Sequence, residues 1–192
     1  MSHELDSHEL DIGSVTVRLV RGDIADQPDA DAIVNAANAE LLPGGGVAGA
    51  IHRAAGPGLA DEASAYAPIE PGQAVLTGGH DLPNPYVIHL LGPRYGVDEP
   101  ADRLLADGYR EALSLADAEG LRIVATPAVS TGAFGYPMDD GARIALQTVT
   151  DLAPRLTSLR EVRFVLYDER DLNAFGRALA AIADERSRRL TP

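Results

Sequence analysis

The chain has 192 residues, of which 45% are hydrophobic, and this length and composition fit one globular domain. It contains no cysteine, and its 16 basic residues are all arginine, which excludes disulfides, thiolate nucleophiles, zinc–thiolate sites and lysine Schiff bases. The formal net charge of −13 opposes binding to nucleic acid or anionic membranes, so we expect no broad nucleic-acid surface and only local groups for any anionic ligand.

The first segment along the chain, residues 1–13, contains the repeated sequence SHELD. Its histidines and glutamates could suggest a metal site, but a polar head offers no preorganised ligands, and we predict a disordered segment without metal. It also lacks the basic start and apolar middle of a signal peptide, and no apolar run approaches the roughly 20 residues of a membrane span. We therefore expect a cytoplasmic protein with no membrane partner, and one domain over residues 14–190.

Short strand-like segments alternate with helical ones from Ser14 onward. Helices are predicted at 47–55, 57–66, 102–119, 139–152 and 171–186. Six runs rich in strand formers end in Gly, Pro, Asn or Asp, namely SVTVRLVRGD, DAIVNAAN, QAVLTGG, YVIHLLGP, RIVATPAVS and VRFVLYDE. This alternation predicts an α/β sandwich around a largely parallel sheet, whose ligands bind at the carboxyl ends of strands.

Polar and glycine-rich loops follow four of these predicted strands. GDI follows the first, NAAN with PGGG the second, STGAFGYP the fifth and YDE the sixth. Because carboxyl ends of parallel strands meet at one edge of a sheet, we expect the four loops to converge on one site.

Two of these loops are suited to phosphate. In PGGGVAGAI, glycines lead into a helix, so backbone N–H groups can approach a ligand closely beside the helix's positive end. The loop has neither the lysine of a P-loop nor the GxGxxG fingerprint, and alone it could be a flexible turn. STGAFGYP repeats its chemistry, and together the two loops could clamp a pyrophosphate with neutral donors.

Single residues at the strand ends offer groups for a sugar and a base. Asn35 and Asn38 suit sugar hydroxyls, although asparagine is also a common turn former. Asp23 could accept a hydrogen bond from the exocyclic amine of a base, or cap the following turn. Tyr167 could stack on a base, or be a partly buried aromatic residue at a strand end.

We interpret the other titratable residues as structural and not functional. His52 and His89 lie in apolar surroundings, which favours packing, and Asp168, Glu169 and Asp171 form an acidic segment typical of a solvated turn. No Ser-His-Asp order and no metal-ligand spacing is present. We therefore predict neither a metal nor a cofactor.

In order and spacing these motifs resemble the macrodomain family, particularly its MacroD-like branch. The matches are GDI, DAIVNAAN, GGGVAGAIHRAAG, VIHLLGP and STGAFGYP. The resemblance implies a three-layer α/β/α sandwich around a mixed, largely parallel six-stranded sheet, with a cleft for ADP-ribose. It places adenine on Asp23 and beside Tyr167, with the Ile24 amide nearby. Asn38 would meet the distal ribose as the catalytic residue, with Asn35 supporting its loop.

The resemblance also places the pyrophosphate between the two glycine-containing loops. The residues implied on one side are Gly44, Gly45, Gly46, Val47 and Ala48. Those implied on the other side are Ser130, Thr131, Gly132, Ala133 and Phe134, followed by Gly135 and Tyr136.

The implied activity is hydrolysis of ADP-ribosyl conjugates, removing mono-ADP-ribose from ester-linked protein by substrate-assisted attack of water. The partners would be ADP-ribose and ADP-ribosylated macromolecules, bound by a monomer. The branch commonly carries Asp where this chain has Ala48, ten positions after Asn38, so no general base is available there. The sequence GGGVAGA resembles the corresponding loop of viral macrodomains, many of which hydrolyse such conjugates without that Asp. A non-catalytic reader, or a hydrolase of O-acetyl-ADP-ribose or ADP-ribosylated nucleic acid, remain the alternatives.

Overall fold

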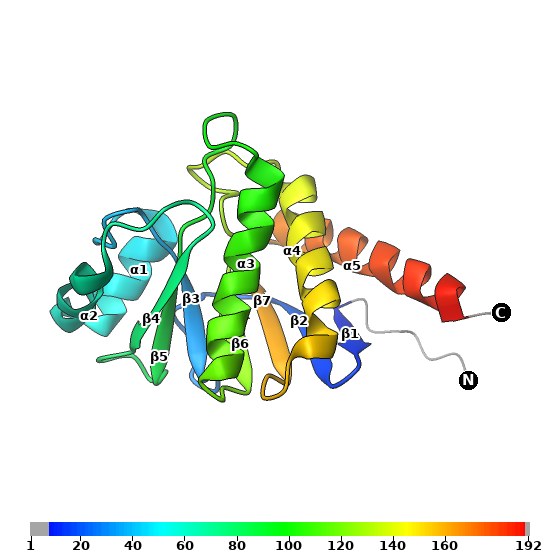
Figure 1. Ribbon diagram of the computed structural model, residues 1–192, viewed down its shortest axis with the longest axis horizontal. Helices are drawn as coiled ribbons and strands as arrows, with labels where there is room; N and C mark the ends of the chain where they lie inside the picture. Colours follow the sequence, from blue (N-terminus) through cyan, green and yellow to red (C-terminus); the bar gives the residue numbers. More distant parts are fainter. Residues whose placement is uncertain (1–7, 191–192) are drawn as a thin grey trace.

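A mixed sheet of seven strands forms the centre of the molecule (Figure 1). The structure is a computed structural model that describes residues 8–190. The strand order is β1-β2-β7-β6-β3-β5-β4, in which β1 and β4 are antiparallel to their neighbours and the five inner strands are parallel. The strands are β1 (Glu9–Ile12), β2 (Val15–Arg21), β3 (Ala32–Ala36), β4 (Ala74–Gly78), β5 (Tyr86–Leu90), β6 (Ile123–Thr126) and β7 (Glu161–Leu166).

Helices cover both faces of this sheet, which confirms the predicted three-layer α/β/α fold (Figure 1). The predicted helix at 57–66 ends earlier than expected, because its last three residues tighten into a 3₁₀ turn, Ser64–Tyr66. Within residues 8–190, no helix is both long enough and apolar enough to cross a membrane. The helices are α1 (Gly46–Ala55), α2 (Pro57–Ala63), α3 (Ala101–Ala118), α4 (Met138–Leu152) and α5 (Glu169–Leu190), with a second 3₁₀ turn at Ala153–Arg155.

The seventh strand corrects the prediction of six strands and of a disordered head over residues 1–13. Residues 9–12 pair antiparallel with β2, and the carboxylate of Glu9 lies 2.8 Å from the guanidinium of Arg18. Ile12 is buried in the core. The strand ELDI has only two apolar positions and belongs to a polar repeat, so its sequence carries almost no strand signal. Residues 1–7 of the predicted head lie outside the described residues.

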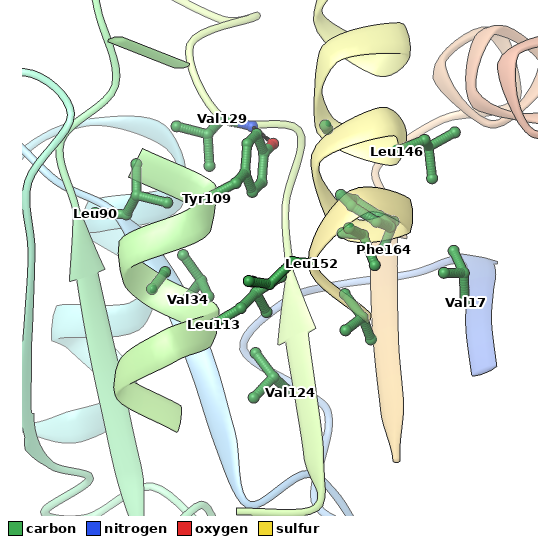
Figure 2. Close-up of a cluster of buried hydrophobic side chains, with 14 of the residues drawn as sticks. Val17, Val34, Leu90, Tyr109, Leu113, Val124, Val129, Leu146, Leu152 and Phe164 are labelled. Atoms are coloured by element: carbon green, nitrogen blue, oxygen red, sulfur yellow. Dashed lines mark hydrogen bonds between the residues drawn. The ribbon is translucent and has the colours of Figure 1, made fainter. Parts of the chain in front are cut away.

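Side chains of the inner strands alternate between two hydrophobic cores. One core lies between the sheet and α3, α4 and α5, where Val34, Val124 and Phe164 of three neighbouring strands pack against Leu113 and Leu152 (Figure 2). The other core lies beneath α1 and α2. The strand residues next to those of the first core, such as Ile33 and Val165, point into it. This period of two is that of a sheet buried on both faces. The parallel pairing of the five inner strands brings their carboxyl ends to one edge of the sheet.

Tyr109 of α3 joins the larger core to the loop that follows β6. Its buried hydroxyl accepts a 3.0 Å hydrogen bond from the N–H of Val129 and donates to the carbonyl of Pro127 at 3.3 Å. Figure 2 shows this hydroxyl beside the Val129 nitrogen. Burial raises the pKa of the Tyr109 hydroxyl, so it keeps the proton that it donates. The start of the loop is therefore fixed from within the core.

Candidate functional site

Two adjoining cavities lie at the carboxyl ends of the parallel strands. The Tyr167 lobe, of about 550 Å³, is lined by residues 22–24, part of α1, residues at the ends of β6 and β7, including Tyr167, and Asp171 of α5. The Asn38 lobe, of about 440 Å³, is lined by residues 36–38, 44–48, Gly92, 128–130 and 132–134. Gly46, Val47, Ala128 and Gly132 line both, so the two lobes form one continuous cleft.

The N terminus of α1 lies where the two lobes meet. Gly46 has φ +56°, in the left-handed region that favours glycine, and this conformation turns the loop into the helix. Within the described chain no side chain caps α1, and its first turn contains no acidic residue. The first N–H groups of a helix have no partner inside the helix, and they carry its positive partial charge. The junction therefore favours an anionic group without using a cation.

The loop after β6 closes the cleft opposite α1. Ser130 has φ +68°, its carbonyl accepts from the N–H of Tyr136 at 2.9 Å, and the hydroxyl of Thr131 donates to the carbonyl of Ala128 at 2.7 Å. A side chain at Gly92 would overlap the Ser130 hydroxyl, so Gly92 allows this close approach. The loop thus folds back on itself and exposes the backbone of Gly132 to both lobes.

Comparison with known proteins identifies this arrangement. A family model described as Macro domain matches residues 34–145, which is more than half of the chain. The chain belongs to the macrodomain family. A macrodomain of Oceanobacillus iheyensis solved with ADP has 36% identity and a TM-score of 0.87, covering 92% of this chain and 96% of that one. A Trypanosoma brucei macrodomain solved in complex with ADP-ribose has 38% identity and a TM-score of 0.81, covering 90% of this chain and 74% of that one.

Curated macrodomain relatives are similar over nearly their whole length. A macro domain-containing protein of Caldanaerobacter subterraneus is 45% identical, covering 84% of this chain and 94% of its own. A protein of Cronobacter turicensis named O-acetyl-ADP-ribose deacetylase is also 45% identical, covering 85% of this chain and 95% of its own. These names fit the MacroD-like branch that the sequence motifs resemble.

The macrodomain cleft brings together most of the residues predicted from the sequence. Three predicted residues do not line either lobe. Asn35 is buried behind the cleft, Tyr136 packs edge-on against Tyr95 with its hydroxyl bonded to Asp102, and Gly135 forms a turn at φ +71°. The lobes are lined by Asp23, Ile24, Asn38, Gly44, Gly45, Gly46, Val47, Ala48, Ser130, Thr131, Gly132, Ala133, Phe134 and Tyr167.

Asn38 already forms two hydrogen bonds within its own loop. Its Nδ2 donates to the carbonyl of Leu42 at 2.8 Å, and its Oδ1 accepts from the N–H of Leu42 at 3.0 Å. The turn-forming interpretation is therefore correct for this side chain. A carboxamide has a second N–H and a second lone pair, so Asn38 keeps one donor and one acceptor for a ligand in the lobe.

The structural alternative that the sequence left open is correct for Asp23 and wrong for Tyr167. The Oδ1 of Asp23 accepts from the N–H of Ala25 at 2.9 Å, so this carboxylate does cap the following turn, with acceptor capacity to spare. Tyr167 is 87% exposed, so the alternative of a partly buried aromatic residue is wrong. An exposed ring at the rim of a cavity is available for stacking.

A row of buried polar side chains lies beneath α1. The Nδ1 of His89 lies 3.1 Å from the Nδ2 of Asn35, and the Nε2 of His89 lies 2.9 Å from the hydroxyl of Thr77. His52 of α1 is also buried, with its ring centroid 6.3 Å from that of His89, which confirms both histidines as core residues. Burial, followed by the proximity of His52, lowers the pKa of His89 to about 4. Burial also lowers the pKa of His52, so both rings are neutral supports for α1 at neutral pH.

His89 makes the stability of this macrodomain depend on pH. Its pKa in the folded state is about 4, whereas an exposed histidine titrates near 6.5. Between pH 6.5 and pH 4 the unfolded chain gains the proton and the folded protein does not, so stability falls as the pH falls through this range. We expect a loss of about 2 kcal/mol between pH 7 and pH 5 from this residue alone. Urea unfolding of wild type and His89→Gln at both pH values checks this, and equal losses in the two proteins would contradict it.

The sequence analysis missed two charged residues of the Tyr167 lobe. Arg53 lines it from α1, seven positions after Gly46 and hence on the same helix face. Asp171, interpreted as part of a solvated turn, lines it from the first turn of α5, and burial, then the neighbouring Asp168, raises its pKa. Helical spacing from the glycine loop could have identified Arg53. Within residues 8–190, no cluster of three or more His, Cys, Asp or Glu side chains is arranged for a metal ion.

Proposed function

We propose that this macrodomain binds ADP-ribose and hydrolyses its esters, namely O-acetyl-ADP-ribose and ester-linked mono-ADP-ribosyl protein. The observation that carries the proposal is the uncapped N terminus of α1 at the junction of two lobes. A diphosphate at this junction would be held by backbone N–H groups of both loops. Adenine would then lie in the Tyr167 lobe between Asp23 and Tyr167, and the distal ribose in the Asn38 lobe.

The lining of the Asn38 lobe defines what chemistry is possible there. It consists of Asn38, Ser130, glycines and apolar residues, so none of the residues that line it can act as a general base near neutral pH. The base nearest to a bound water would be the diphosphate of the substrate itself. Well-oriented reactants can gain on the order of 7 kcal/mol from placement alone. Substrate-assisted attack by a positioned water is therefore the mechanism that we propose.

The bonds made and broken depend on the ester. In acetyl-ADP-ribose, the water oxygen bonds to the acyl carbon, the ribose oxygen leaves with the electron pair, and it takes up a proton. In an ester at the anomeric carbon, the water oxygen bonds to that carbon and the protein carboxylate leaves. The names of the curated relatives, O-acetyl-ADP-ribose deacetylase, support the first substrate. Asn38 would orient the ribose in both cases through its remaining donor and acceptor.

A non-catalytic reader of ADP-ribose is the second candidate. Ala48 occupies the position of the branch's usual carboxylate and is buried at the wall of the Asn38 lobe, and among residues 8–190 no titratable side chain lines that lobe. A reader needs only the binding groups. In either case we propose a single domain over residues 14–190, with β1 added, that acts as a monomer in the cytoplasm on ADP-ribosylated macromolecules.

Binding and turnover measured on the same protein test this proposal. Calorimetry should give at least about tenfold tighter binding for ADP-ribose than for AMP, because only ADP-ribose uses both loops and the Asn38 lobe. Turnover should be measured on O-acetyl-ADP-ribose, an ester-linked ADP-ribosyl protein and an ADP-ribosylated oligonucleotide. Equal affinity for AMP and ADP-ribose would contradict the placement of the ligand. Tight binding with no turnover on any of the three would identify a reader.

A further inference from the structure

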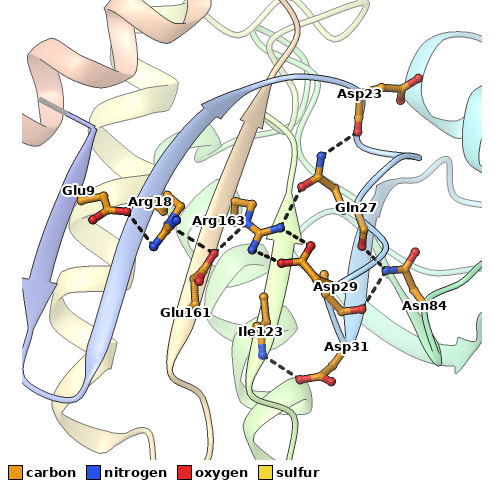
Figure 3. A network of polar contacts seen from close by, with 11 residues as sticks. Glu9, Arg18, Asp23, Gln27, Asp29, Asp31, Asn84, Ile123, Glu161 and Arg163 are labelled. Atoms are coloured by element: carbon orange, nitrogen blue, oxygen red, sulfur yellow. Dashed lines mark hydrogen bonds and ion pairs between the residues drawn. The ribbon is translucent and has the colours of Figure 1, made fainter. Parts of the chain in front are cut away.

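Gln27 lies in the loop between β2 and β3 and connects Asp23 to the centre of the sheet (Figure 3). Its side chain is almost fully buried. Its Nε2 donates to the carbonyl of Asp23 at 3.0 Å, and its Oε1 accepts from Nη1 of Arg163 at 3.1 Å. The amide therefore uses one end for the loop and the other for β7.

Arg163 provides a rigid anchor for this connection. Its buried guanidinium forms two parallel 2.8 Å hydrogen bonds with the carboxylate of Asp29, and its Nε donates to Glu161 at 2.7 Å. The bond from Arg163 lowers the pKa of Asp29, so this carboxylate stays ionised. A planar guanidinium held by two carboxylates has little freedom to move. The position of the Gln27 Oε1 is therefore set by β7.

Asn84 holds the same loop from the other side. Its buried Nδ2 donates to the carbonyl of Gln27 at 2.7 Å and to the carbonyl of Ala30 at 2.8 Å. The backbone of Gln27 is thus fixed by Asn84, and its side chain by Arg163. In Figure 3 the carboxylate of Asp23 points away from this network, so the network holds the Asp23 backbone and leaves its side chain outside.

We propose that Gln27 is a positioning residue that determines base specificity by fixing the Asp23 backbone at the mouth of the Tyr167 lobe. The inference rests on the proposed function, because it needs a purine in that lobe. Adenine presents an exocyclic amine that donates to Asp23, whereas hypoxanthine presents a carbonyl at the same position, which the carboxylate repels. Discrimination between these groups requires the carboxylate to stay at hydrogen-bond distance. A loop that shifts by a fraction of an ångström can still bind a purine but loses this discrimination.

The test compares ADP-ribose with its hypoxanthine counterpart in wild type and in Gln27→Met, which keeps the length of the side chain without hydrogen bonds. Wild type should prefer adenine by about tenfold or more. In Gln27→Met this ratio should fall to about threefold or less, through weaker binding of ADP-ribose. The turnover number at saturating ADP-ribosyl substrate should stay unchanged, because the Asn38 lobe is not altered. Thermal melting establishes that the variant is folded.

Asp29→Asn is the matched control. Asp29 contacts the same arginine, but its side chain is 62% exposed, and its replacement leaves Glu161 bonded to the Nε of Arg163 and Gln27 bonded to the Asp23 carbonyl. The adenine preference of Asp29→Asn should equal that of wild type. A preference lost equally in both variants would show general loosening of the network and overturn the role of Gln27.

The remaining outcomes separate the two proposals. If wild type does not bind ADP-ribose, the proposed function fails. If wild type binds and discriminates but Gln27→Met keeps the wild-type ratio, only the role of Gln27 is overturned. Should Gln27→Met fail to fold, Gln27→Glu replaces it, because a carboxylate still accepts from Arg163 but cannot donate to the Asp23 carbonyl. A wild-type ratio in Gln27→Glu overturns the inference equally.

Discussion

Gly132→Glu should abolish ADP-ribose binding while the protein remains folded. Gly132 is exposed and lines both lobes, and a Cβ at this position would meet no atom within 4 Å. The fold therefore tolerates a side chain here, but the new carboxylate would face the bound diphosphate. Two like charges about 4 Å apart near a protein surface repel by about 4 kcal/mol, which is close to a thousandfold in affinity. Calorimetry measures the loss, and circular dichroism the fold.

Gly132→Gln is the matched control, because it adds the same volume without charge. We expect it to weaken binding less than Gly132→Glu, and the difference should shrink at high salt, which screens exposed charges. If a folded Gly132→Glu binds ADP-ribose as wild type does, the diphosphate does not lie between the two loops.

The fold could be predicted from the sequence because its inner strands are continuous apolar runs that end at turn residues. Segments such as YVIHLLGP and RIVATPAVS became β5 and β6 with buried side chains on both faces. Strand β1 could not be predicted from an apolar run, because a four-residue edge strand with one solvent-facing side needs few apolar residues. Its stability comes from pairing with β2 across the two-residue turn of Gly13 and Ser14, in which Gly13 has φ +66°. This Gly-Ser turn is a local hairpin signal that the sequence analysis did not use.

Only the part of the site formed by loops with a recognisable local sequence at strand ends could be predicted. Glycines and asparagines after β3 and β6 indicated the cleft, because backbone exposure and polar side chains are local features. Arg163 and Gln27 could not be found in this way. They are separated by 136 positions, and each looks like an ordinary surface residue until the sheet brings β7 beside the loop after β2. Asn38 was identified, but its two bonds to Leu42 depend on the loop conformation.

Asn38→Ala should lower turnover by at least about tenfold, equivalent to roughly 1.4 kcal/mol of transition-state stabilisation, with a smaller loss of ADP-ribose affinity. The variant also loses both bonds to Leu42, so Asn38→Asp is needed beside it. A carboxylate still accepts from the Leu42 N–H but can donate nothing to the ribose. A similar loss of turnover in both variants would assign the effect to the missing carboxamide N–H groups, which donate to the Leu42 carbonyl and, in the proposed complex, to the ribose. Wild-type turnover in Asn38→Ala would remove Asn38 from the mechanism.

Ala48→Asp should be tolerated or accelerate hydrolysis at saturating substrate. Ala48 is the third residue of α1 and lines the Asn38 lobe, so a carboxylate there lies beside the proposed water and gains about 0.3 to 1 kcal/mol from the helix N terminus. The same charge repels the diphosphate, which raises KM, so the turnover number and KM must be determined separately. Ala48→Asn is the neutral control of equal size. An Ala48→Asp turnover number well below that of Ala48→Asn would show that the added carboxylate does not act as a base. If wild type also binds ADP-ribose tightly and cleaves no conjugate, Ala48 marks a reader.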